Sequence, residues 1–288
     1  MRTKNWTRID ISCGPETAEY LASELAESFG VTVEFTAGGI RVYFDSARFE
    51  DERERLGEVL RSASAFEGGD IIYDSSEIPD EDWSETWKAH FKPLRVGRHI
   101  LISPTWEKVR PEADDLLIQI DPGRAFGTGH HETTRLCLEW LESWASNLSG
   151  KHPGALLDVG TGSGILAMAG ALLGFDKIIG IDNDPEAIEV ALQNLELNSL
   201  NGKVNVSCAT PDEITGTFDV VISNIQSLPL IRMSRTMVSK VSVPGRLVLS
   251  GILTEQADDV RAEYENRGLK LTGTQTAGEW ILLAFEKR

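Results

Sequence analysis

The chain has 288 residues, and its 28 Lys and Arg against 45 Asp and Glu give a formal net charge of −17. At ~100–200 residues per domain, this length predicts two domains, and a composition of 41% hydrophobic and 25% charged residues excludes a wholly disordered chain. An acidic surface repels phosphate backbones, so we expect no direct nucleic-acid partner. The same charge would attract a basic partner, such as a lysine-rich protein.

No apolar run approaches the ~18 residues needed to span a bilayer, and the N-terminus lacks the apolar core of a signal peptide. The three cysteines, Cys13, Cys137 and Cys208, are widely separated and form no CxxC pair. This spacing predicts neither a disulfide framework nor a zinc site. We therefore expect a cytoplasmic protein that does not bind membranes.

Residues 1–75 have the pattern of a small α+β domain. Strands are predicted where polar and apolar residues alternate, and helices where apolar residues recur every three or four positions. The predicted elements, in chain order, are a strand at 6–11, a helix at 15–29, strands at 31–35 and 40–44, a helix at 47–64 and a strand at 71–73. The order β-α-β-β-α-β is that of a ferredoxin-like domain.

Residues 76–100 are predicted to form a linker that contains a short helix. The segment is polar and acidic at its start and includes Pro79, which favours a break in regular structure. Trp83, Trp87 and Phe91 recur every four residues, so they would share one face of that helix. Packing against a domain explains such a stripe better than a ligand cage does.

The remainder, residues 101–288, is predicted to form an α/β domain. Two strands, at 99–102 and 116–120, lead into it. Further strands are predicted at 155–159, 177–182, 204–208, 218–223, 245–250, 269–272 and 280–285, with the clearest helix at 185–197. The last two strands lie close together around Gly278, a spacing typical of an antiparallel pair that closes a mostly parallel seven-stranded sheet.

A glycine-rich segment, Gly160-Thr161-Gly162-Ser163-Gly164, follows the strand at 155–159 and opens a helix. Glycines let a ligand approach the backbone closely at a helix N-terminus. A phosphate-binding P-loop would need Lys after the last glycine, but Ile165 stands there. The run 162–167 does match the dinucleotide pattern G-x-G-x-x-A, so an NAD-dependent oxidoreductase is an alternative.

Asp158, just before the loop, argues against a dinucleotide. A carboxylate ~4 Å from a pyrophosphate would cost on the order of 4 kcal/mol at an effective dielectric constant of about 20. If Asp158 points into the loop, the ligand there is positively charged. S-adenosylmethionine, which has no phosphate and carries an ammonium group, meets that demand.

Two further polar residues end predicted strands. Asp182 is the last residue of the strand at 177–182. It could accept hydrogen bonds from both ribose hydroxyls of a dinucleotide or of S-adenosylmethionine, or alternatively cap the next helix. Asn224 follows the strand at 218–223, at the edge where an open α/β sheet binds its ligand. Its amide could hold an acceptor amine with the lone pair toward a methyl donor, or it could simply form a turn.

The segment Asp121-Pro122-Gly123-Arg124-Ala125-Phe126-Gly127-Thr128-Gly129-His130-His131-Glu132-Thr133-Thr134 is the most specific motif of the chain. Together with the glycine loop, Asp182-Asn183-Asp184-Pro185 and Asn224-Ile225, it resembles the ribosomal protein L11 methyltransferases, the PrmA family. The resemblance implies a Rossmann-like class I methyltransferase domain at 101–288 behind a substrate-recognition domain. It implies S-adenosylmethionine as the cofactor, and lysine side-chain and N-terminal amines of ribosomal protein L11 as the acceptors.

The same resemblance assigns roles to residues. It implies that Thr134, Gly160, Asp182 and Asn224 contact the cofactor, and that Phe126, Gly127 and Thr128 cover its methionyl end. From its place at a strand end, Asn224 is also the candidate catalytic residue that aligns the acceptor amine. The expected cofactor-binding residues are Phe126, Thr128, Thr134, Asp158, Gly160, Gly162, Gly164, Asp182 and Asn224. We expect the enzyme to act as a monomer on ribosomal protein L11.

One departure concerns the acceptor side. The family usually continues after the Asn-Ile pair with Leu-Ala-Gly-Pro-Leu, whereas this chain has Gln226-Ser227-Leu228-Pro229-Leu230. The two polar residues leave open a class I methyltransferase that acts on lysines of another protein or on a small amine, or a binding module without catalysis. His130-His131 would suggest a metal, but adjacent histidines tend to point apart and no further ligand set accompanies them, so no metal is expected.

Overall fold

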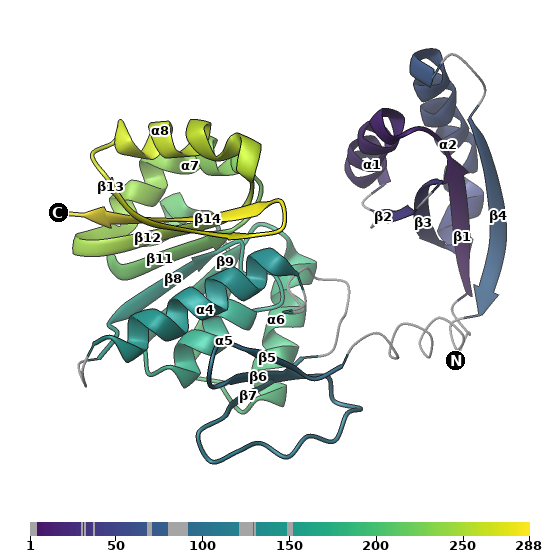
Figure 1. Cartoon of the computed structure of the whole chain (residues 1–288). Coiled ribbons are helices and arrows are strands. Elements are labelled where there is room, and N and C mark those ends of the chain that lie inside the picture. Colours follow the sequence, from purple (N-terminus) through teal and green to yellow (C-terminus); the bar gives the residue numbers. More distant parts are fainter. Residues whose placement is uncertain are drawn as a thin grey trace. The chain divides into compact units, whose positions relative to one another are not determined.

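A computed structural model describes residues 5–29, 31, 33–36, 38–67, 71–79, 92–120, 129, 131–148 and 152–288. The chain divides into two compact units, Met1–His90 and Phe91–Arg288 (Figure 1). Each unit has its own hydrophobic core. Trp83, Trp87 and Phe91, predicted to share a helix face, lie outside the described residues.

The first unit has the predicted order of elements. In chain order these are β1 (Asn5–Ser12), α1 (Pro15–Phe29), β2 (Val33–Thr36), β3 (Gly39–Asp45), α2 (Ser46–Glu67) and β4 (Ile72–Pro79). The strands form one antiparallel sheet in the order β2-β3-β1-β4. Because β1 pairs with both β3 and β4, the first strand of the chain lies in the interior of the sheet.

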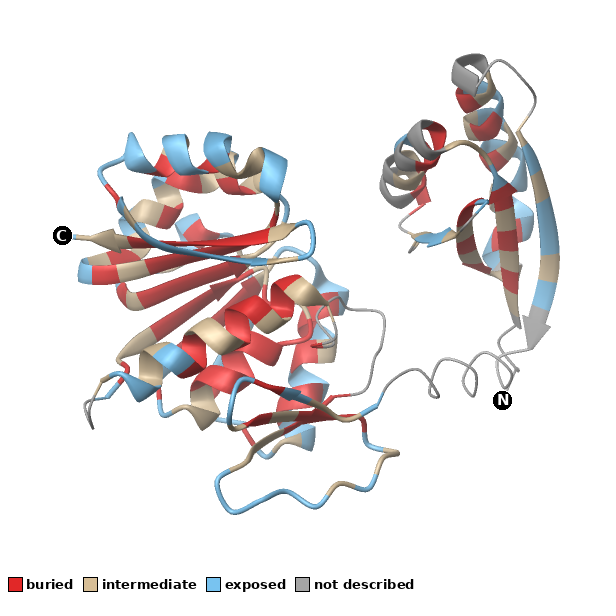
Figure 2. Ribbon diagram, viewed as in Figure 1, coloured by how far each residue is buried: buried red, intermediate tan, exposed pale blue. Residues whose placement is uncertain are grey.

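Alternation along β1 and β3 builds the core of this unit. Ile9 and Ile11 on β1, and Val42 and Phe44 on β3, are buried, whereas the residues between them are more exposed (Figure 2). They pack with the apolar residues of α1 and α2, and the ring of Phe29 meets that of Phe44 edge-on at 5.5 Å. The helices therefore cover one face of the sheet, as the period-two pattern predicts.

The predicted linker at 76–100 includes residues of two different sheets, the four-stranded sheet of the first unit and a small three-stranded sheet of the second. Strand β4 continues to Pro79 and pairs with β1 along its whole length, so it is longer than the strand predicted at 71–73. At the other end, β5 (Leu94–Val96) already pairs with β6 (Ile100–Ser103). Pairing with a distant strand, rather than local propensity, extends both elements.

The second unit contains the seven-stranded sheet. Its elements are β8 (Ala155–Val159), α5 (Ile165–Leu172), β9 (Lys177–Asp182), α6 (Pro185–Leu197), β10 (Val204–Cys208), β11 (Phe218–Asn224), α7 (Ser227–Lys240), β12 (Val241–Leu253), α8 (Ala257–Glu265), β13 (Lys270–Ala277) and β14 (Trp280–Lys287). The strand order is β10-β9-β8-β11-β12-β14-β13, with β14 antiparallel to both of its neighbours and the other pairs parallel. The predicted α/β sheet with an antiparallel pair at its end is confirmed.

Two hydrophobic layers cover this sheet. Helices α4 (Glu132–Ser146), α5 and α6 pack on one face, and α7 and α8 pack on the other (Figure 1). Successive residues of a strand point to opposite faces, so on β8 Leu156 joins the first layer and Leu157 the second. Such double coverage explains why these strands are almost continuously apolar.

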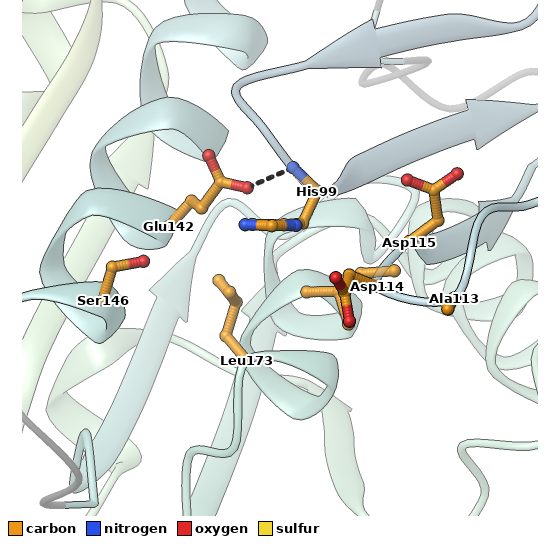
Figure 3. Close-up of a pocket in the computed structure, with 8 residues that line it drawn as sticks. His99, Ala113, Asp114, Asp115, Glu142, Ser146 and Leu173 are labelled. Atoms are coloured by element: carbon orange, nitrogen blue, oxygen red, sulfur yellow. Dashed lines mark hydrogen bonds between the residues drawn. The ribbon is translucent and has the colours of Figure 1, made fainter.

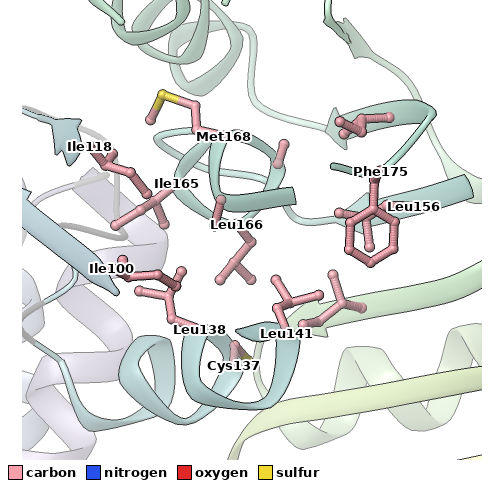
Figure 4. Close-up of a cluster of buried hydrophobic side chains, with 14 of the residues drawn as sticks. Ile100, Ile118, Cys137, Leu138, Leu141, Leu156, Ile165, Leu166, Met168 and Phe175 are labelled. Carbon is pink, nitrogen blue, oxygen red and sulfur yellow. The ribbon is translucent and has the colours of Figure 1, made fainter. Parts of the chain in front are cut away.

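A small three-stranded sheet extends the first layer. Strand β6 pairs antiparallel with β5 and parallel with β7 (Leu116–Gln119). Ile100 and Ile118 from this sheet pack with Leu138 of α4 and Ile165 of α5 (Figure 4). The sheet thus stabilises the two helices that lie on either side of the glycine loop in the sequence.

Glu142 joins the small sheet to α4. Its carboxylate is buried and accepts hydrogen bonds from the backbone N–H groups of Arg98 (2.8 Å) and His99 (2.6 Å), in the turn between β5 and β6. A shallow hollow of about 410 Å³ borders this contact and is lined also by Asp114 and Asp115 (Figure 3). A Cβ at Gly97 would collide with the carboxylate of Glu142, so the turn and the helix fit closely.

Among the described residues, no helix is long and apolar enough to cross a membrane.

We predict that Glu142→Ala lowers the free energy of unfolding by about 3 kcal/mol, because two backbone N–H groups lose a charged acceptor. Urea unfolding followed by circular dichroism measures this loss. The matched control is Glu139→Ala on the same helix, where no partner is lost and a change within about 0.5 kcal/mol is expected. Equal losses in the two variants would show that the helix, not the contact to the turn, was damaged.

Candidate active site

A cavity of about 620 Å³ opens at the carboxyl ends of β8, β9 and β11. This is the edge of an open α/β sheet where ligands bind, and the volume suits a ligand of nucleoside size. Its walls come from the glycine loop, from strands β8, β9, β11, β12 and β14, and from helices α4, α5 and α7. The lining residues are His131, Thr133, Thr134, Val159, Gly160, Thr161, Gly162, Ile165, Leu166, Ile181, Asp182, Asn183, Ala209, Thr210, Pro211, Asn224, Ile225, Gln226, Pro229, Met233, Gly251 and Trp280.

Backbone hydrogen bonds to the neighbouring strand hold the glycine loop. The N–H groups of Gly160 and Thr161 both donate to the carbonyl of Ile181 at 2.9 Å. The N–H of Gly164 then donates to the carbonyl of Thr161, which closes a tight turn before α5. At Gly160, φ is +75° and a Cβ would collide with Ile225, so only glycine fits without strain.

Asp182 connects the loop to the next helix. One carboxylate oxygen accepts from the N–H of Gly162 at 2.9 Å, and the other accepts from the N–H of Asp184 at 3.1 Å. Asp184 itself caps α6 through the N–H of Glu186. Each oxygen of Asp182 keeps a further lone pair beside the cavity, so the carboxylate can hold the loop and also accept from ligand hydroxyls.

The side chain of Asn224 has a hydrogen-bond acceptor, Oδ1, that no described donor reaches. Its amide nitrogen donates to the hydroxyl of Thr134 on α4 at 3.2 Å. Its carbonyl oxygen Oδ1 is buried and has no hydrogen-bond partner among the described residues. Because an unsatisfied buried acceptor is costly, a donor such as an amine or an ammonium group could complete this oxygen.

The structure places Asp158 behind the glycine loop and not in the wall of the cavity. Its side chain is fully buried and does not line the cavity; instead it lies behind the loop, where Oδ2 accepts from the hydroxyl of Thr161 at 2.6 Å. Burial, the largest cause, raises the pKa of Asp158 to about 7, and the charge of Asp182 raises it further. Hydrogen bonds from the Thr161 hydroxyl and the Ala167 N–H act in the opposite direction and lower this pKa. The carboxylate of Asp158 therefore contacts the loop residue Thr161, which itself lines the cavity.

The other predicted site residues divide into three groups. Thr134, Gly160, Gly162, Asp182 and Asn224 all border the cavity. Gly164 does not; it is the N-cap of α5 and faces Ala191 of α6. Phe126 and Thr128, expected to cover the methionyl end, lie outside the described residues, as do Gly127 and His130.

His131 and Trp280 form a wall of the cavity that sequence reasoning did not assign. Their rings meet at 5.1 Å in an edge-to-face arrangement. His131 is the N-cap of α4, and its Nδ1 accepts from the N–H of Thr133, which places the ring proton of the neutral form on Nε2. Among the described residues, no cluster of three or more His, Cys, Asp or Glu could hold a metal ion.

Trp280 reaches the cavity because β14 pairs antiparallel with β12. A register shift in β12 between Leu249 and Ile252 accompanies a positive φ at Gly251, which also lines the cavity. Such a bulge re-aims the end of a strand. The only sequence signal for it was the glycine near the end of an apolar run, which does not identify the partner strand.

The chemistry of the walls suits a ligand without phosphates. Among the described residues that line the cavity, none is Lys or Arg, and the only charged side chain is Asp182. A pyrophosphate would find no counter-charge there. A ribose, an ammonium group and an apolar ring would find a carboxylate, an unpaired amide oxygen and aliphatic walls such as Ile181 and Pro211.

Comparisons with known proteins agree with this interpretation. The family model described as ribosomal protein L11 methyltransferase (PrmA) matches residues 5–288. Ribosomal protein L11 methyltransferases of Pelobacter propionicus and Geobacter sulfurreducens are each 40% identical, over 99% and 98% of this chain and 98% of their own length. A crystal structure of ribosomal protein L11 methylase from Lactobacillus delbrueckii subsp. bulgaricus is 29% identical, with a TM-score of 0.62 over 68% of this chain and 98% of that one.

We predict that Gly160→Ala weakens S-adenosylmethionine binding at least about ten-fold, because the added methyl group would push Ile225 into the cavity. Isothermal titration calorimetry measures the affinity. The matched control is Gly174→Ala: φ is +88° there, but nothing lies within 4 Å of an added Cβ. The strained backbone costs each variant about 1 kcal/mol of stability, and the collision adds to this loss only in Gly160→Ala. Equal affinities of the two variants would contradict the role of Gly160.

Proposed function

The chain belongs to the PrmA family of ribosomal protein L11 methyltransferases, and we propose that it transfers methyl groups from S-adenosylmethionine to lysine side-chain and N-terminal amines of ribosomal protein L11. The observation that supports the chemistry best is the unpaired Oδ1 of Asn224 at the cavity wall. It is an acceptor placed where a donor amine could be aligned. The NAD-dependent alternative is not retained, since the family is one of methyltransferases and the described residues that line the cavity include no Lys or Arg for a pyrophosphate.

The residues present fit the cofactor. Asp182 would accept hydrogen bonds from the ribose hydroxyls while it keeps its bonds to the loop, and Gly160 and Thr134 would border the methionyl end. When bound, the cofactor supplies a methyl group on a positively charged sulfur, a leaving group that is already activated. The protein must therefore position the acceptor, remove its proton and exclude water.

Deprotonation of the acceptor is the energetic difficulty. A lysine amine with a reference pKa near ~10.4 costs roughly 4.6 kcal/mol to deprotonate at pH 7, whereas an N-terminal amine with a pKa of ~7.8 costs about 1 kcal/mol. A desolvating site lowers the lysine value by disfavouring the charged form. Asn224 would accept one N–H of the neutral amine through Oδ1 and so direct its lone pair away from the amide, while Thr134 fixes the amide's orientation.

The first unit is proposed to recognise the protein substrate. A net charge of −17 over the chain complements a lysine-rich partner and favours fast encounter. Gln226, which is exposed at the cavity rim, favours one alternative acceptor, an amine of another protein or a small molecule, because it adds a polar group beside Asn224. It stays a prediction that the enzyme is a monomer in the cytoplasm. The domain limits 1–75, 76–100 and 101–288 also stay predictions.

We expect purified ribosomal protein L11 to gain mass in steps of one methyl group when it is incubated with this protein and S-adenosylmethionine. Intact-mass spectrometry followed by peptide mapping measures the number of groups and their positions. The control is the same incubation with the cofactor omitted. No gain in mass, with cofactor binding confirmed by calorimetry, would move the substrate to another amine.

We expect Asn224→Ala to lower the rate of methyl transfer at least about 100-fold while it weakens S-adenosylmethionine binding less than about five-fold, in line with loss of one positioned polar group. Single-turnover kinetics and calorimetry measure the two quantities separately. Asn183→Ala removes the amide of another lining residue, next to Asp182, and provides the contrast, since it should leave the rate at saturating cofactor within about three-fold. Equal losses of rate and affinity in Asn224→Ala would contradict the aligning role.

A further inference from the structure

Asp158 is a charged residue that the proposed mechanism does not use. It lies on β8, whose alternation directs it toward the layer that contains α4 and α5. Its side chain is fully buried, and only Oδ2 has a side-chain donor, the hydroxyl of Thr161. Oδ1 has no hydrogen-bond partner among the described residues. An asparagine has the same shape and could accept the same bond, so the charge itself requires an explanation.

No described group neutralises this charge. The loop contributes the Thr161 hydroxyl, α5 contributes the N–H of Ala167, and α4 contributes the thiol of Cys137. Burial raises the pKa of Cys137 far above its usual range, so the thiol stays neutral. From β9, the facing charge is the carboxylate of Asp182, which repels Asp158. A buried carboxylate with these neighbours destabilises the cofactor-free protein.

The missing counter-charge is one that a ligand can supply. The hydroxyl of Thr161 donates a hydrogen bond to Asp158, and Thr161 also lines the cavity. One residue therefore separates the buried carboxylate from the space that a ligand would occupy. In a water-excluded region, a charge on the ligand side of the loop interacts with Asp158 with little screening. The two forms of the cofactor differ in this respect: the donor carries a sulfonium, whereas the product left after transfer has a neutral thioether and one methyl group less.

We propose that Asp158 is a positioning residue that makes the cavity selective for the sulfonium cofactor over its neutral thioether product. This inference rests on the proposed function and adds to it a means of releasing the product. The buried charge is unfavourable in the empty cavity, is neutralised when the sulfonium binds, and is again without a full counter-charge after the methyl group leaves. The selectivity acts through Thr161 and the loop, not through direct contact.

The pH dependence has a definite sign. With a pKa of about 7 in the folded protein, against 3.8 for an ordinary aspartate, Asp158 binds a proton below pH 7. The cofactor-free protein therefore loses stability as the pH rises from about 4 to about 7, since the unfolded chain is ionised there and the folded chain is not. Binding of the sulfonium favours the ionised form, so it releases a proton near pH 7, and affinity falls as the pH drops from 8 to 6.

The test compares three isosteric variants, Asp158→Asn, Asp182→Asn and Asp219→Asn, with the wild type by calorimetry at pH 8, using S-adenosylmethionine and S-adenosylhomocysteine as ligands. Asp158→Asn should lower the ratio of the affinities for the two ligands on the order of ten-fold. Asp182→Asn should weaken both ligands alike, because both contain the ribose. Asp219, which accepts from the N–H of Ala155 at the opposite end of the strands, is the control that should change neither affinity.

Two further readouts separate selectivity from mere support of the loop. Without ligand at pH 8, Asp158→Asn should unfold at a higher temperature than the wild type, since a buried charge is removed. In wild type, titrations in two buffers of different ionisation enthalpy at pH 7 should show proton release with the sulfonium and less with the thioether, and this measurement needs no variant.

An equal loss of affinity for both ligands in Asp158→Asn, or an unchanged ratio, would show that the residue only supports the loop and would overturn the inference. Equal proton release with the two ligands in wild type would overturn it as well. Failure of the wild type to bind either ligand would instead overturn the proposed function, and with it this inference.

Discussion

The active site depends on hydrogen bonds between the glycine loop and the end of β9. The carbonyl of Ile181 accepts from two successive N–H groups of the loop, and the carboxylate of Asp182 accepts from a third, that of Gly162. These bonds exist because β8 and β9 are parallel neighbours in register, which brings their carboxyl ends to one level. A loop held in this way is ready to receive a ligand without further ordering, which lowers the entropic cost of binding.

Helix α4 carries this rigidity to the reacting end of the cavity. Its N-terminal turn supplies Thr134, which orients the amide of Asn224, and its C-terminal half supplies Glu142, which binds the turn before β6. Between them, Leu138 and Leu141 pack into the core under the small sheet. One helix thus connects the buried, unpaired amide oxygen of Asn224 to a sheet outside the main fold.

Two polar groups of the site are arranged at a cost to the cofactor-free protein. Oδ1 of Asn224 and Oδ1 of Asp158 are both buried without a partner among the described residues. Binding sites retain such groups where a ligand offsets the cost, either by a direct hydrogen bond or, as proposed for Asp158, by its charge across the loop. The glycines of the loop contribute in another way, since Gly160 permits an approach of Ile225 that no other residue would allow.

The sequence by itself determined several helices and strands of the α/β domain and the edge of the sheet at which the site lies. The helix from Pro185 to Leu197 and the strands at 155–159, 177–182 and 204–208 have the predicted bounds, because capping residues and buried apolar runs are local signals. It also placed Asp182 and Asn224 at strand ends, and parallel strands bring such ends together. Only the tertiary structure decided which side chains turn toward the cavity: Asp158 lies behind the loop, and Trp280 enters through the bulge and pairing of β12 with β14. Side-chain direction at a loop and the partner of a strand depend on contacts between distant segments, and local sequence patterns do not contain that information.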